Sequence, residues 1–436
     1  MNADLKKIIS QTILIVCISA NIMFGQQILD SKCGFDFMME TYEQQYPGFK
    51  TAVSNTFEKI KKSEESPFLR NEILTIDVVF HIVWKENAEN LHDSIIYNQL
   101  EILNKDYRLL NDNRDEIRAL FKDRQADARI EFNLKEIVRV KTNANFALSL
   151  TGLPDNVKNG SNGGSNAISP DKTLNIWICH IRPIPFIGAQ ILGYAYPPAG
   201  LDNWPAGSNA PSAGLDGVVL DFRVAGSNNP NQLTVQGMNY TSLGRTCVHE
   251  VGHYLGLRHI WGDGGGIFGG SSCNADDGME DTPNQGAETG FGCDKNNNTC
   301  IDTQNDLPDM IENYMDYSLE SCQNIFTKDQ VSHMRKVLFN QRKGLIEGQV
   351  SAYDITENLS LKIIPNPVSE QSHVYFGEVK TGTIQILDAV GKVVFSQNIT
   401  DLQHYILPTD ILKSGLYHLI FWDQNGKIST GRLIKH

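Results

Sequence analysis

The spacing of hydrophobic residues along this chain changes repeatedly between the pattern of buried strands and that of amphipathic helices. Continuous apolar runs rich in Val and Ile indicate buried strands, and apolar residues three and four positions apart indicate helices with one buried face. Strands and helices in mixed order predict an α/β or α+β domain with a mixed, twisted sheet over residues 71–348. The strand patterns occupy 73–84, 129–140, 174–181, 190–196 and 217–222, and helical spacing occupies 94–122, a segment that begins near Thr241, and 327–342.

The pattern changes at about residue 350, where short alternating runs are separated by turn sequences. Examples of these turns are Asn366-Pro367, Ser414-Gly415 and Asn425-Gly426. Several short strands at this spacing predict a small all-β sandwich over 350–436, which follows the mixed domain. We find no constellation of catalytic residues in this second part of the chain.

The first residues have the pattern of an export signal. Lys6 and Lys7 precede a mostly apolar run from Ile8 to Phe24, and Gly25 follows. Polar residues interrupt the run, which argues against a membrane anchor. Residues 1–25 are therefore predicted to be a signal peptide. No second segment is long and apolar enough to span a bilayer, so we expect no transmembrane segment.

Charge and cysteine content narrow the possible functions. The net charge of −13 argues against nucleic acid or an anionic membrane as the main partner. One of the eight cysteines, Cys17, lies in the predicted signal peptide, which leaves seven, and four of these lie between residues 273 and 322. Clustered cysteines in an exported protein are commonly oxidised. An odd number leaves at least one thiol outside any intramolecular disulfide.

Three histidines on and after one predicted helix form the pattern with the most chemical content. His249 and His253 are four residues apart, so both imidazoles lie on one helix face and can reach one ion. Gly256 permits a positive φ, so the helix can end there and the chain can return His259 to the same ion. Three neutral imidazoles with a fourth position open for water are typical of catalytic zinc, and Glu250 is placed to act on that water as a base. The histidines outside this motif occur singly and are interpreted as core or surface residues.

The eleven residues from His249 to His259 resemble the zinc-binding motif of the metzincin metallopeptidases. The segment 313–317 resembles their Met-turn, with Met315 as its methionine. The residues within the motif and the downstream Asp281-Thr282-Pro283 most resemble those of the pappalysin group. The resemblance covers 71–348 and implies a metzincin-like catalytic domain. Its implied activity is hydrolysis of peptide bonds in proteins or peptides, by a zinc-activated water with Glu250 as general base.

The resemblance also implies roles for residues outside the motif. Tyr317 would stabilise the oxyanion beside zinc, with a packed core tyrosine as the alternative. The edge strand 190–196 would receive substrate as an added antiparallel strand. Two disulfides would brace the region before the Met-turn, and calcium would bind near the acidic run 276–282, for which a solvated loop is the alternative. The implied disulfides are Cys273–Cys300 and Cys293–Cys322, and our candidate calcium ligands are Asp277, Asp281 and Thr282.

Residues 26–70 are polar and helix-prone, show no strong core pattern, and are interpreted as a propeptide. Metzincin zymogens can use a propeptide cysteine as the fourth zinc ligand, a role that Cys33 would fill. Cleavage around 60–72, for example beside Arg70, would then release the active enzyme. The alternative is a disulfide from Cys33 to Cys179 or Cys247, although both of these resemble buried thiols.

In metzincins the chain after the Met-turn forms a wall of the S1′ pocket, which receives the side chain that follows the scissile bond. Glu320 stands in this segment, two residues before Cys322, where pappalysin-like enzymes that cut before Arg or Lys can carry an Asp. A carboxylate in a partly desolvated pocket would pair with a cationic side chain. We therefore predict cleavage before Arg or Lys, with a solvent-facing carboxylate as the alternative.

The tail resembles the C-terminal sorting domain of type IX secretion in four places, Ile364-Pro365-Asn366-Pro367-Val368, Ile386-Leu387-Asp388-Ala389-Val390-Gly391-Lys392-Val393-Val394, Leu412-Lys413-Ser414-Gly415-Leu416-Tyr417 and Arg432-Leu433-Ile434-Lys435. The resemblance implies export machinery as a partner and a location outside a Gram-negative bacterium, either secreted or at the cell surface. A carbohydrate-binding sandwich is the alternative. The whole chain is thus predicted to be a secreted zinc endopeptidase. The competing hypothesis is a surface adhesion or binding protein that retains a non-catalytic zinc site.

Overall fold

The computed structural model divides the chain into two compact units, Met1–Gln349 and Val350–His436, which we describe separately. The predicted signal peptide over 1–25 and the expected cleavage position at Arg70 lie outside the described residues. No helix within the described residues is long and apolar enough to cross a membrane. The structure describes residues 32–63, 72–149, 152–183, 190–198, 200, 212–235, 238–262, 272–290, 292–303, 306–347, 361–389, 391–424 and 428–436.

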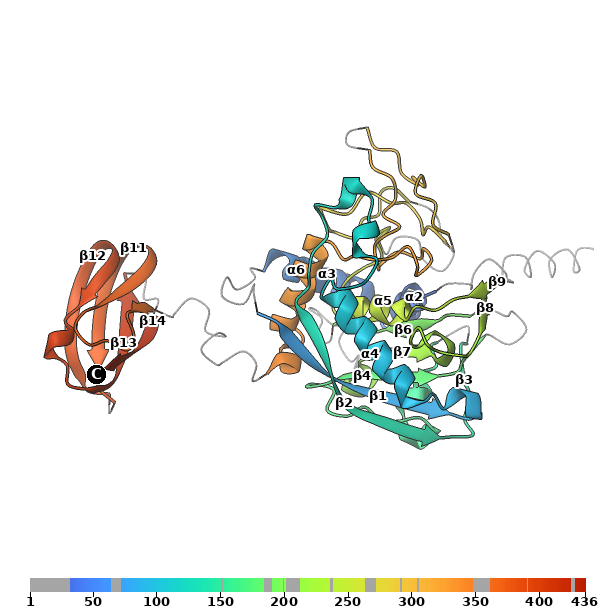
Figure 1. Cartoon of the computed structure of the whole chain (residues 1–436), viewed down its shortest axis with the longest axis horizontal. Helices are drawn as coiled ribbons and strands as arrows, with labels where there is room; N and C mark the ends of the chain where they lie inside the picture. Colours follow the sequence, from blue (N-terminus) through green and yellow to red (C-terminus); the bar gives the residue numbers. More distant parts are fainter. Residues whose placement is uncertain are drawn as a thin grey trace, which may run out of the picture. The chain divides into compact units, whose positions relative to one another are not determined.

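A five-stranded mixed sheet organises the first unit, with the strand order β2-β1-β4-β7-β6 (Figure 1). Strands β2, β1, β4 and β7 run parallel, and the edge strand β6 runs antiparallel to β7. The mixed α/β architecture predicted from the sequence is confirmed. The strands of this sheet are β1 Leu74–Trp84, β2 Ile130–Lys141, β4 Leu174–Cys179, β6 Gly193–Ala195 and β7 Val218–Asp221, and two smaller pairs join β3 Phe146–Ala147 to β5 Ile181–Arg182 and β8 Leu233–Val235 to β9 Met238–Tyr240.

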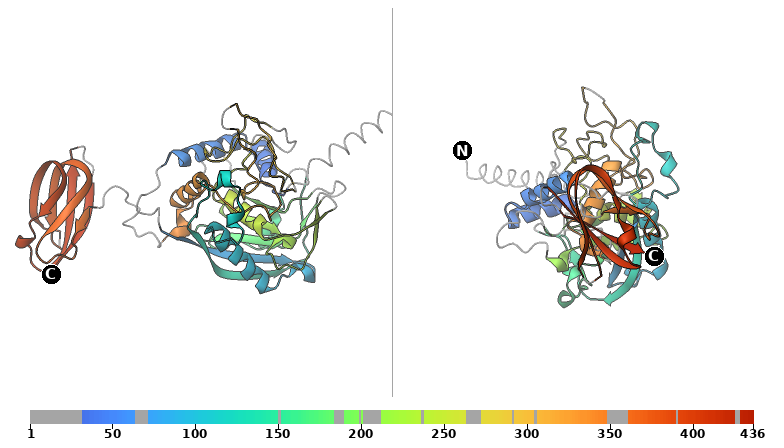
Figure 2. Two further views of the ribbon diagram at one scale, coloured as in Figure 1. Left: turned by 45° about the horizontal axis from the view of Figure 1, so that its top comes forward. Right: turned by 90° about the vertical axis from the view of Figure 1, so that its left-hand side faces the viewer.

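Helices carry the functional residues to one edge of this sheet (Figures 1 and 2). Helix α4 (Asp93–Tyr107) packs on β2, and helix α5 (Arg245–Tyr254) packs on β6, β7 and α4. Every residue of α5 is buried, so its histidines lie inside the unit rather than on its surface. The helix with the predicted metal motif is therefore held directly against the edge strand.

Two helices are shorter than their hydrophobic spacing indicated. The helix expected over 94–122 ends at Tyr107, because Leu109 adopts a positive φ and the polar run from Asn111 to Asn113 continues as turns. The helix expected from Thr241 begins at Arg245, because Gly244 has a φ of 77° and interrupts the helical backbone. Helix α6 (Lys328–Phe339) begins where expected, with a capping box formed by Thr327 and Gln330.

The segment before the sheet contains two packed helices, α2 (Phe35–Gln45) and α3 (Phe49–Lys62). The expectation that it lacks a core pattern is wrong, because α3 buries a continuous face on the rest of the unit. Apolar residues recur on α3 at helical spacing, and the helix packs beside α6 (Figure 1). Its buried residues are Phe49, Ala52, Val53, Thr56, Phe57 and Ile60.

The second unit is the predicted all-β sandwich, and its strands run antiparallel throughout. Its longest strands exceed the short alternating runs expected, because β11 and β12 continue past each other through irregular positions in their register. Its core includes Val374, Ile384, Leu419, Phe421 and Leu433. The strands are β10 Lys362–Ile364, β11 Ser372–Leu387, β12 Val393–Leu407, β13 Gly415–Asp423 and β14 Ile428–Lys435.

Candidate metal centre and active site

The three histidines of the motif converge on one point. His249 and His253 lie one turn apart on α5, and their Nε2 atoms are 3.1 Å apart. His259 reaches the same point after the helix ends, with its Nε2 atom 3.1 Å from that of His253. The reversal passes through Gly256, whose φ of 91° is readily adopted by glycine. The local backbone therefore assembles the three side chains as the sequence predicted.

Backbone carbonyls fix the direction in which two of these imidazoles face. His249 Nδ1 donates to Tyr314 O at 2.7 Å, and His253 Nδ1 donates to Leu257 O at 2.9 Å. A proton on Nδ1 leaves a lone pair on Nε2, and burial lowers the pKa of both imidazoles, which favours the neutral form. Three buried imidazole nitrogens at this separation suit a shared cation and are the donor set typical of zinc.

Cys33 completes the group from the N-terminal segment. Its Sγ atom and the three histidine nitrogens all lie within 4.8 Å of one another, and all four residues are buried. The amide of Phe35 donates to Sγ at 3.2 Å. Burial raises the pKa of Cys33 well above its usual value, and the nearby Glu250 carboxylate raises it further. A divalent cation among the four atoms would oppose both effects and favour the thiolate.

Glu250 lies beside this group without joining it. Its Oε2 atom is 3.4 Å from Cys33 Sγ, and its side chain is fully buried. Burial raises the pKa of Glu250 to about 8. Gly193 of the edge strand packs on this carboxylate, since a Cβ atom there would lie 2.9 Å from Glu250 Cγ. A side chain at residue 193 would therefore displace the carboxylate.

Met315 and Tyr317 both lie close to the histidine cluster, and they make different contacts there. Met315 packs beneath α5, where a Cβ atom on Gly252 would meet its Sδ atom at 2.5 Å. The Tyr317 ring lies 5.0 Å from the His259 ring, and its hydroxyl donates to Cys33 O at 3.4 Å. Tyr317 thus presents a donor to a backbone carbonyl beside the histidine cluster.

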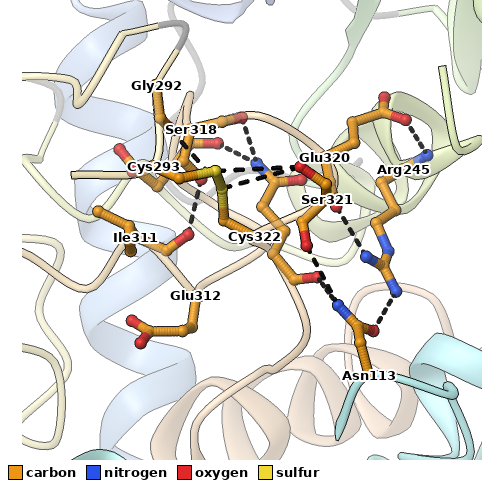
Figure 3. The surroundings of a disulfide bond; sticks show 12 residues. Asn113, Arg245, Gly292, Cys293, Ile311, Glu312, Ser318, Glu320, Ser321 and Cys322 are labelled. Atoms are coloured by element: carbon orange, nitrogen blue, oxygen red, sulfur yellow. Dashed lines mark hydrogen bonds between the residues drawn. A yellow bond between two sulfur atoms is a disulfide. The ribbon is translucent and has the colours of Figure 1, made fainter. Parts of the chain in front are cut away.

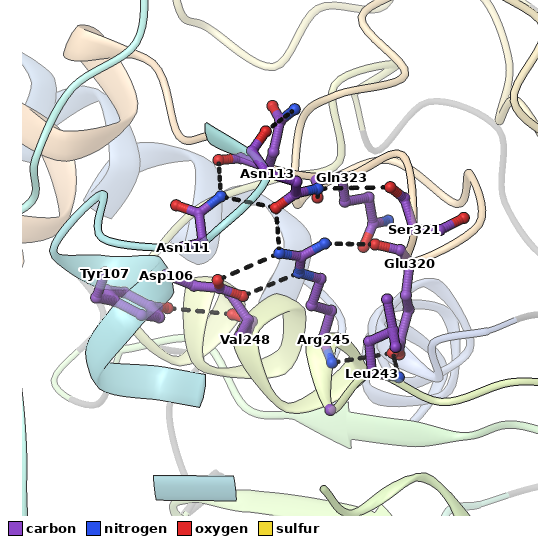
Figure 4. A network of polar contacts seen from close by, with 12 residues as sticks. Asp106, Tyr107, Asn111, Asn113, Leu243, Arg245, Val248, Glu320, Ser321 and Gln323 are labelled. Atoms are coloured by element: carbon purple, nitrogen blue, oxygen red, sulfur yellow. Dashed lines mark hydrogen bonds and ion pairs between the residues drawn. The ribbon is translucent and has the colours of Figure 1, made fainter. Parts of the chain in front are cut away.

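Buried arginines hold both ends of α5. At the start of the helix, Arg245 pairs with Asp106 of α4 at 3.1 Å and donates to Glu320 O at 2.7 Å (Figure 4). At its end, Arg342 donates to Tyr254 O at 2.6 Å and pairs with Asp216 at 2.6 Å. These contacts fix the helix along its axis. They carry no signal in the local sequence, because each joins residues far apart in the chain.

Both oxygens of the Glu320 carboxylate already accept hydrogen bonds within the protein. Its carboxylate accepts from the backbone amides of Leu243, Arg245 and Thr246 and from the Thr246 hydroxyl, so it caps the start of α5. The Lys32 side chain lines the adjoining pocket together with Tyr240, Thr246, Glu320 and Gln323, and its ammonium donates to Ser318 O. Burial lowers the pKa of Lys32 to about 8, although Glu320 and two further carboxylates oppose that shift.

Comparisons with known proteins identify a family for each of the two units. A peptidase M43 family model, described as pregnancy-associated plasma protein-A, matches residues 227–339, and a secretion system C-terminal sorting domain matches 362–436. An extracellular metalloprotease of Pyricularia oryzae is 31% identical over 281 residues, which is 63% of this chain and 78% of that protein. Another from Arthroderma benhamiae is 27% identical over 306 residues, which is 69% of this chain and 83% of that protein.

Solved structures agree with this assignment. Tannerella forsythia promirolysin matches with a TM-score of 0.59 and 30% identity, covering 72% of this chain and 97% of that chain. Mature mirolysin from the same organism, in complex with a cleaved peptide, matches with a TM-score of 0.53 and 31% identity over 64% of this chain and 97% of that chain. This chain belongs to the pappalysin family. It is therefore a metalloendopeptidase, and its histidine cluster fits zinc as the metal.

The second unit of this pappalysin-family member is a sorting domain, so the protein is exported, to the medium or to the cell surface. The first unit contains the disulfides Cys273–Cys300 and Cys293–Cys322, the pairs that the resemblance implied. Figure 3 shows the second of these and its surroundings. The alternative disulfides from Cys33 to Cys179 or Cys247 do not occur, and all three thiols are buried.

The candidate calcium residues of the pappalysin-family unit lie together in one loop. Asp277 is 2% exposed, and its Oδ1 atom accepts from Met279 N at 2.9 Å and from the Thr282 hydroxyl at 2.9 Å. Its Oδ2 atom is buried and accepts no hydrogen bond within the described residues. Asp281 accepts from the amide of Asp329 at the start of α6 through its Oδ2 atom, and its Oδ1 atom is likewise buried without a hydrogen bond within the described residues. A buried carboxylate oxygen without a donor is a position that a cation would satisfy.

Proposed function

We propose that the chain is a secreted zinc endopeptidase made as a latent zymogen, with a signal peptide over 1–25, a propeptide over 26–70, a catalytic domain over 71–348 and a sorting domain over 350–436. His249, His253 and His259 hold the catalytic zinc, and Glu250 is the general base. The convergence of three Nε2 atoms beside a buried carboxylate that does not join them carries this proposal. A purely structural zinc site has no need of that carboxylate.

A zinc ion held by His249, His253 and His259 would supply Lewis acidity toward a peptide carbonyl and would lower the pKa of water. Glu250 takes the proton of the attacking water and delivers it to the leaving amine. In the closed form burial raises the pKa of Glu250 to about 8, and the charge of a bound metal ion would oppose this shift and favour the carboxylate that a base requires. Tyr317 donates to the developing oxyanion. Its contact with Cys33 O supports this role, because a substrate carbonyl would occupy a similar position.

Latency follows from the N-terminal segment. Cys33 Sγ occupies the fourth position beside the three histidine nitrogens, where it excludes water. The segment is also bound to the edge strand, since Gly34 N donates to Gly193 O at 2.8 Å and Leu192 N donates to Lys32 O at 2.9 Å. Proteolysis around 60–72 starts activation by separating the propeptide from β1.

The pocket beside Lys32 supports cleavage before Arg or Lys. It adjoins the histidines, it encloses a basic side chain in this chain, and Glu320, Asp316 and Glu288 all favour a positive charge in it. Because the Glu320 carboxylate already accepts hydrogen bonds from α5, it acts on a bound cation through its charge and less through new hydrogen bonds. Ser318 O contributes a direct acceptor.

Two further features extend the proposal. Asp277, Asp281 and Thr282 contribute to a calcium site that braces the loop after the third histidine, and the uncompensated Asp277 oxygen is its main support. The sorting domain engages the export machinery of a Gram-negative bacterium, after which the tail is removed or anchored at the surface. Neither feature alters the chemistry at the histidines.

The decisive experiment compares the mature enzyme with its Glu250→Ala variant on a peptide library. We expect zinc content to stay at one ion for each chain, and turnover to fall by roughly 10²–10⁴-fold through loss of the base. Glu136→Ala is a matched control, because Glu136 is exposed on β2 and should keep full activity. Wild-type protein that binds peptides but does not cleave them would instead support the surface-binding hypothesis.

A further inference from the structure

An aromatic side chain of the propeptide contacts two flat groups of the catalytic domain. Phe57 of α3 is 3% exposed, and its ring lies 3.9 Å from the Arg258 guanidinium. The His333 ring of α6 stacks on it at 4.4 Å with an interplanar angle of 27°. Gly278 closes the edge, because a Cβ atom there would lie 2.6 Å from the Phe57 ring. We call the space bounded by Arg258, His333 and Gly278 the aromatic slot.

The aromatic slot is continuous with the catalytic centre. A small hollow lies between the histidine cluster and the slot, and its catalytic-domain wall includes Pro197, His253, Gly256, Leu257 and His333, whereas Phe35, Val53, Thr56 and Ile60 of the propeptide form the rest. Phe35 stacks on His253 at 4.1 Å at one end of this hollow, and Phe57 occupies its other end. A polypeptide bound across the histidines can therefore reach the slot with one of its side chains.

The walls of the slot belong to the catalytic domain and remain when the propeptide leaves. Arg258 directly precedes His259, and His333 is 2% exposed on a helix anchored by a capping box. Departure of α3 uncovers the faces of both groups at once. A guanidinium and an imidazole placed together are suited to a flat ring, since the cation is attracted by the ring face and the imidazole stacks on the ring. An aliphatic side chain gains neither interaction.

We propose that in the mature enzyme the aromatic slot binds an aromatic side chain of the protein substrate on the N-terminal side of the scissile bond. This rests on the proposed function, in which substrate lies antiparallel to β6. Cys33 pairs with Gly193 in the parallel direction, and the propeptide runs from the Lys32 pocket past the histidines to Phe35. A substrate of opposite direction places residues before the cut on the Phe35 side, which leads to the slot.

The test uses mature enzyme and peptides with one constant cleavable core. Phe, Leu or Ala is placed in turn at each position from two to eight residues before the cut, and kcat/KM is measured for each peptide. We expect one position, or two adjacent ones, at which kcat/KM of the Phe peptide exceeds that of the Leu peptide by about fivefold or more. Leu is the matched control for hydrophobicity, because it fills similar volume without a ring.

The same peptides are then given to His333→Ala, where the ratio of Phe to Leu should fall to about one. His180→Ala is the control variant, because His180 packs on Phe222 away from the slot and should keep the ratio. Binding of the Phe and Leu peptides to mature Glu250→Ala, measured by fluorescence anisotropy, should show the same preference without turnover.

The outcomes separate this inference from the proposed function. Absence of cleavage of the core by wild-type enzyme would contradict the proposed function. Cleavage with equal rates for Phe and Leu at every position would overturn the aromatic slot alone. A preference that survives unchanged in His333→Ala would also overturn it, and if that variant does not fold, the wild-type peptide series still decides.

Discussion

Replacement of Arg342 by Met tests whether the end of α5 is fixed by a buried ion pair. Arg342 is 5% exposed, donates to Tyr254 O at 2.6 Å, and pairs with Asp216 at 2.6 and 2.9 Å. Its guanidinium also lies 3.3 Å from the Tyr254 ring. Met retains most of the side-chain volume and removes every one of these polar contacts. Gly256 and His259 follow Tyr254 at the end of α5, so movement of this helix end would disturb the histidine cluster.

The expected loss is set by what remains behind. Asp216 is also 5% exposed, so the variant leaves a carboxylate buried without its guanidinium. Breaking a buried pair in this way costs about 3–5 kcal/mol, whereas an exposed pair contributes about 0–1 kcal/mol. We therefore expect the free energy of unfolding of the first unit to fall by about 3–5 kcal/mol. Zinc retention should weaken with it, because the turn to His259 loses its anchor.

The assay is denaturant unfolding of the zymogen, with zinc content measured on the same samples. Lys172→Met is the matched control, since Lys172 pairs with Glu347 on the surface and should cost under about 1 kcal/mol. Arg342→Met combined with Asp216→Asn should recover at least about 1 kcal/mol, because no buried charge remains. An Arg342→Met protein within about 1 kcal/mol of wild type would refute the reasoning.

Two further predictions concern the propeptide and the pocket beside the histidines. Cys33→Ala precursor should cleave peptides before any proteolysis, because the fourth position beside the histidine nitrogens opens; a variant as latent as wild type would exclude the thiol as inhibitory group. Glu320→Gln should lose the preference for Arg and Lys after the cut. It should also destabilise the start of α5 by about 1–3 kcal/mol, because one oxygen that accepts from the helix amides becomes an amide NH2 group, which cannot accept. Cleavage profiling and denaturant unfolding measure these two effects, and an unchanged profile would mean that the charge of Glu320 does not select substrates.

The metal cluster was predictable because it depends on local geometry. A helix places His249 and His253 on one face at fixed spacing, and a glycine permits the reversal that returns His259. The place of Cys33 at the same point was implied by the resemblance to metzincin zymogens, and not by any spacing. For the histidines the signal lies in the residue type and in short-range spacing. The fold class was predictable for the same reason, since strands and helices differ in period.

Contacts between distant segments were not predictable in this way. Glu320 reads as a lone carboxylate in the sequence, and its role as a cap for α5 appears only when residues about 75 positions apart meet. His333 was interpreted as an ordinary single histidine, and its stacking on Phe57 depends on two helices far apart in sequence. The core face of α3 is encoded in the sequence, since Phe49, Val53 and Phe57 recur every four residues, but the four lysines and one glutamate of the helix obscured it.

The direction of the propeptide has a consequence for the proposed activation. The propeptide pairs with the edge strand in the parallel direction, and its Cys33 Sγ atom lies 3.4 Å from Glu250 Oε2. A substrate would pair in the antiparallel direction, so the propeptide presents no peptide bond in the orientation that a substrate would have. Lys32, Cys33 and Phe57 hold the segment at three separate places on the catalytic domain. A single cut around 60–72 removes only the covalent link and leaves all three contacts in place. Because a tethered segment gains only effective concentration from its link, the cut propeptide stays bound until it dissociates or is degraded. Activation is therefore a two-step process under this proposal, and the second step is limited by release of these contacts rather than by the first cleavage.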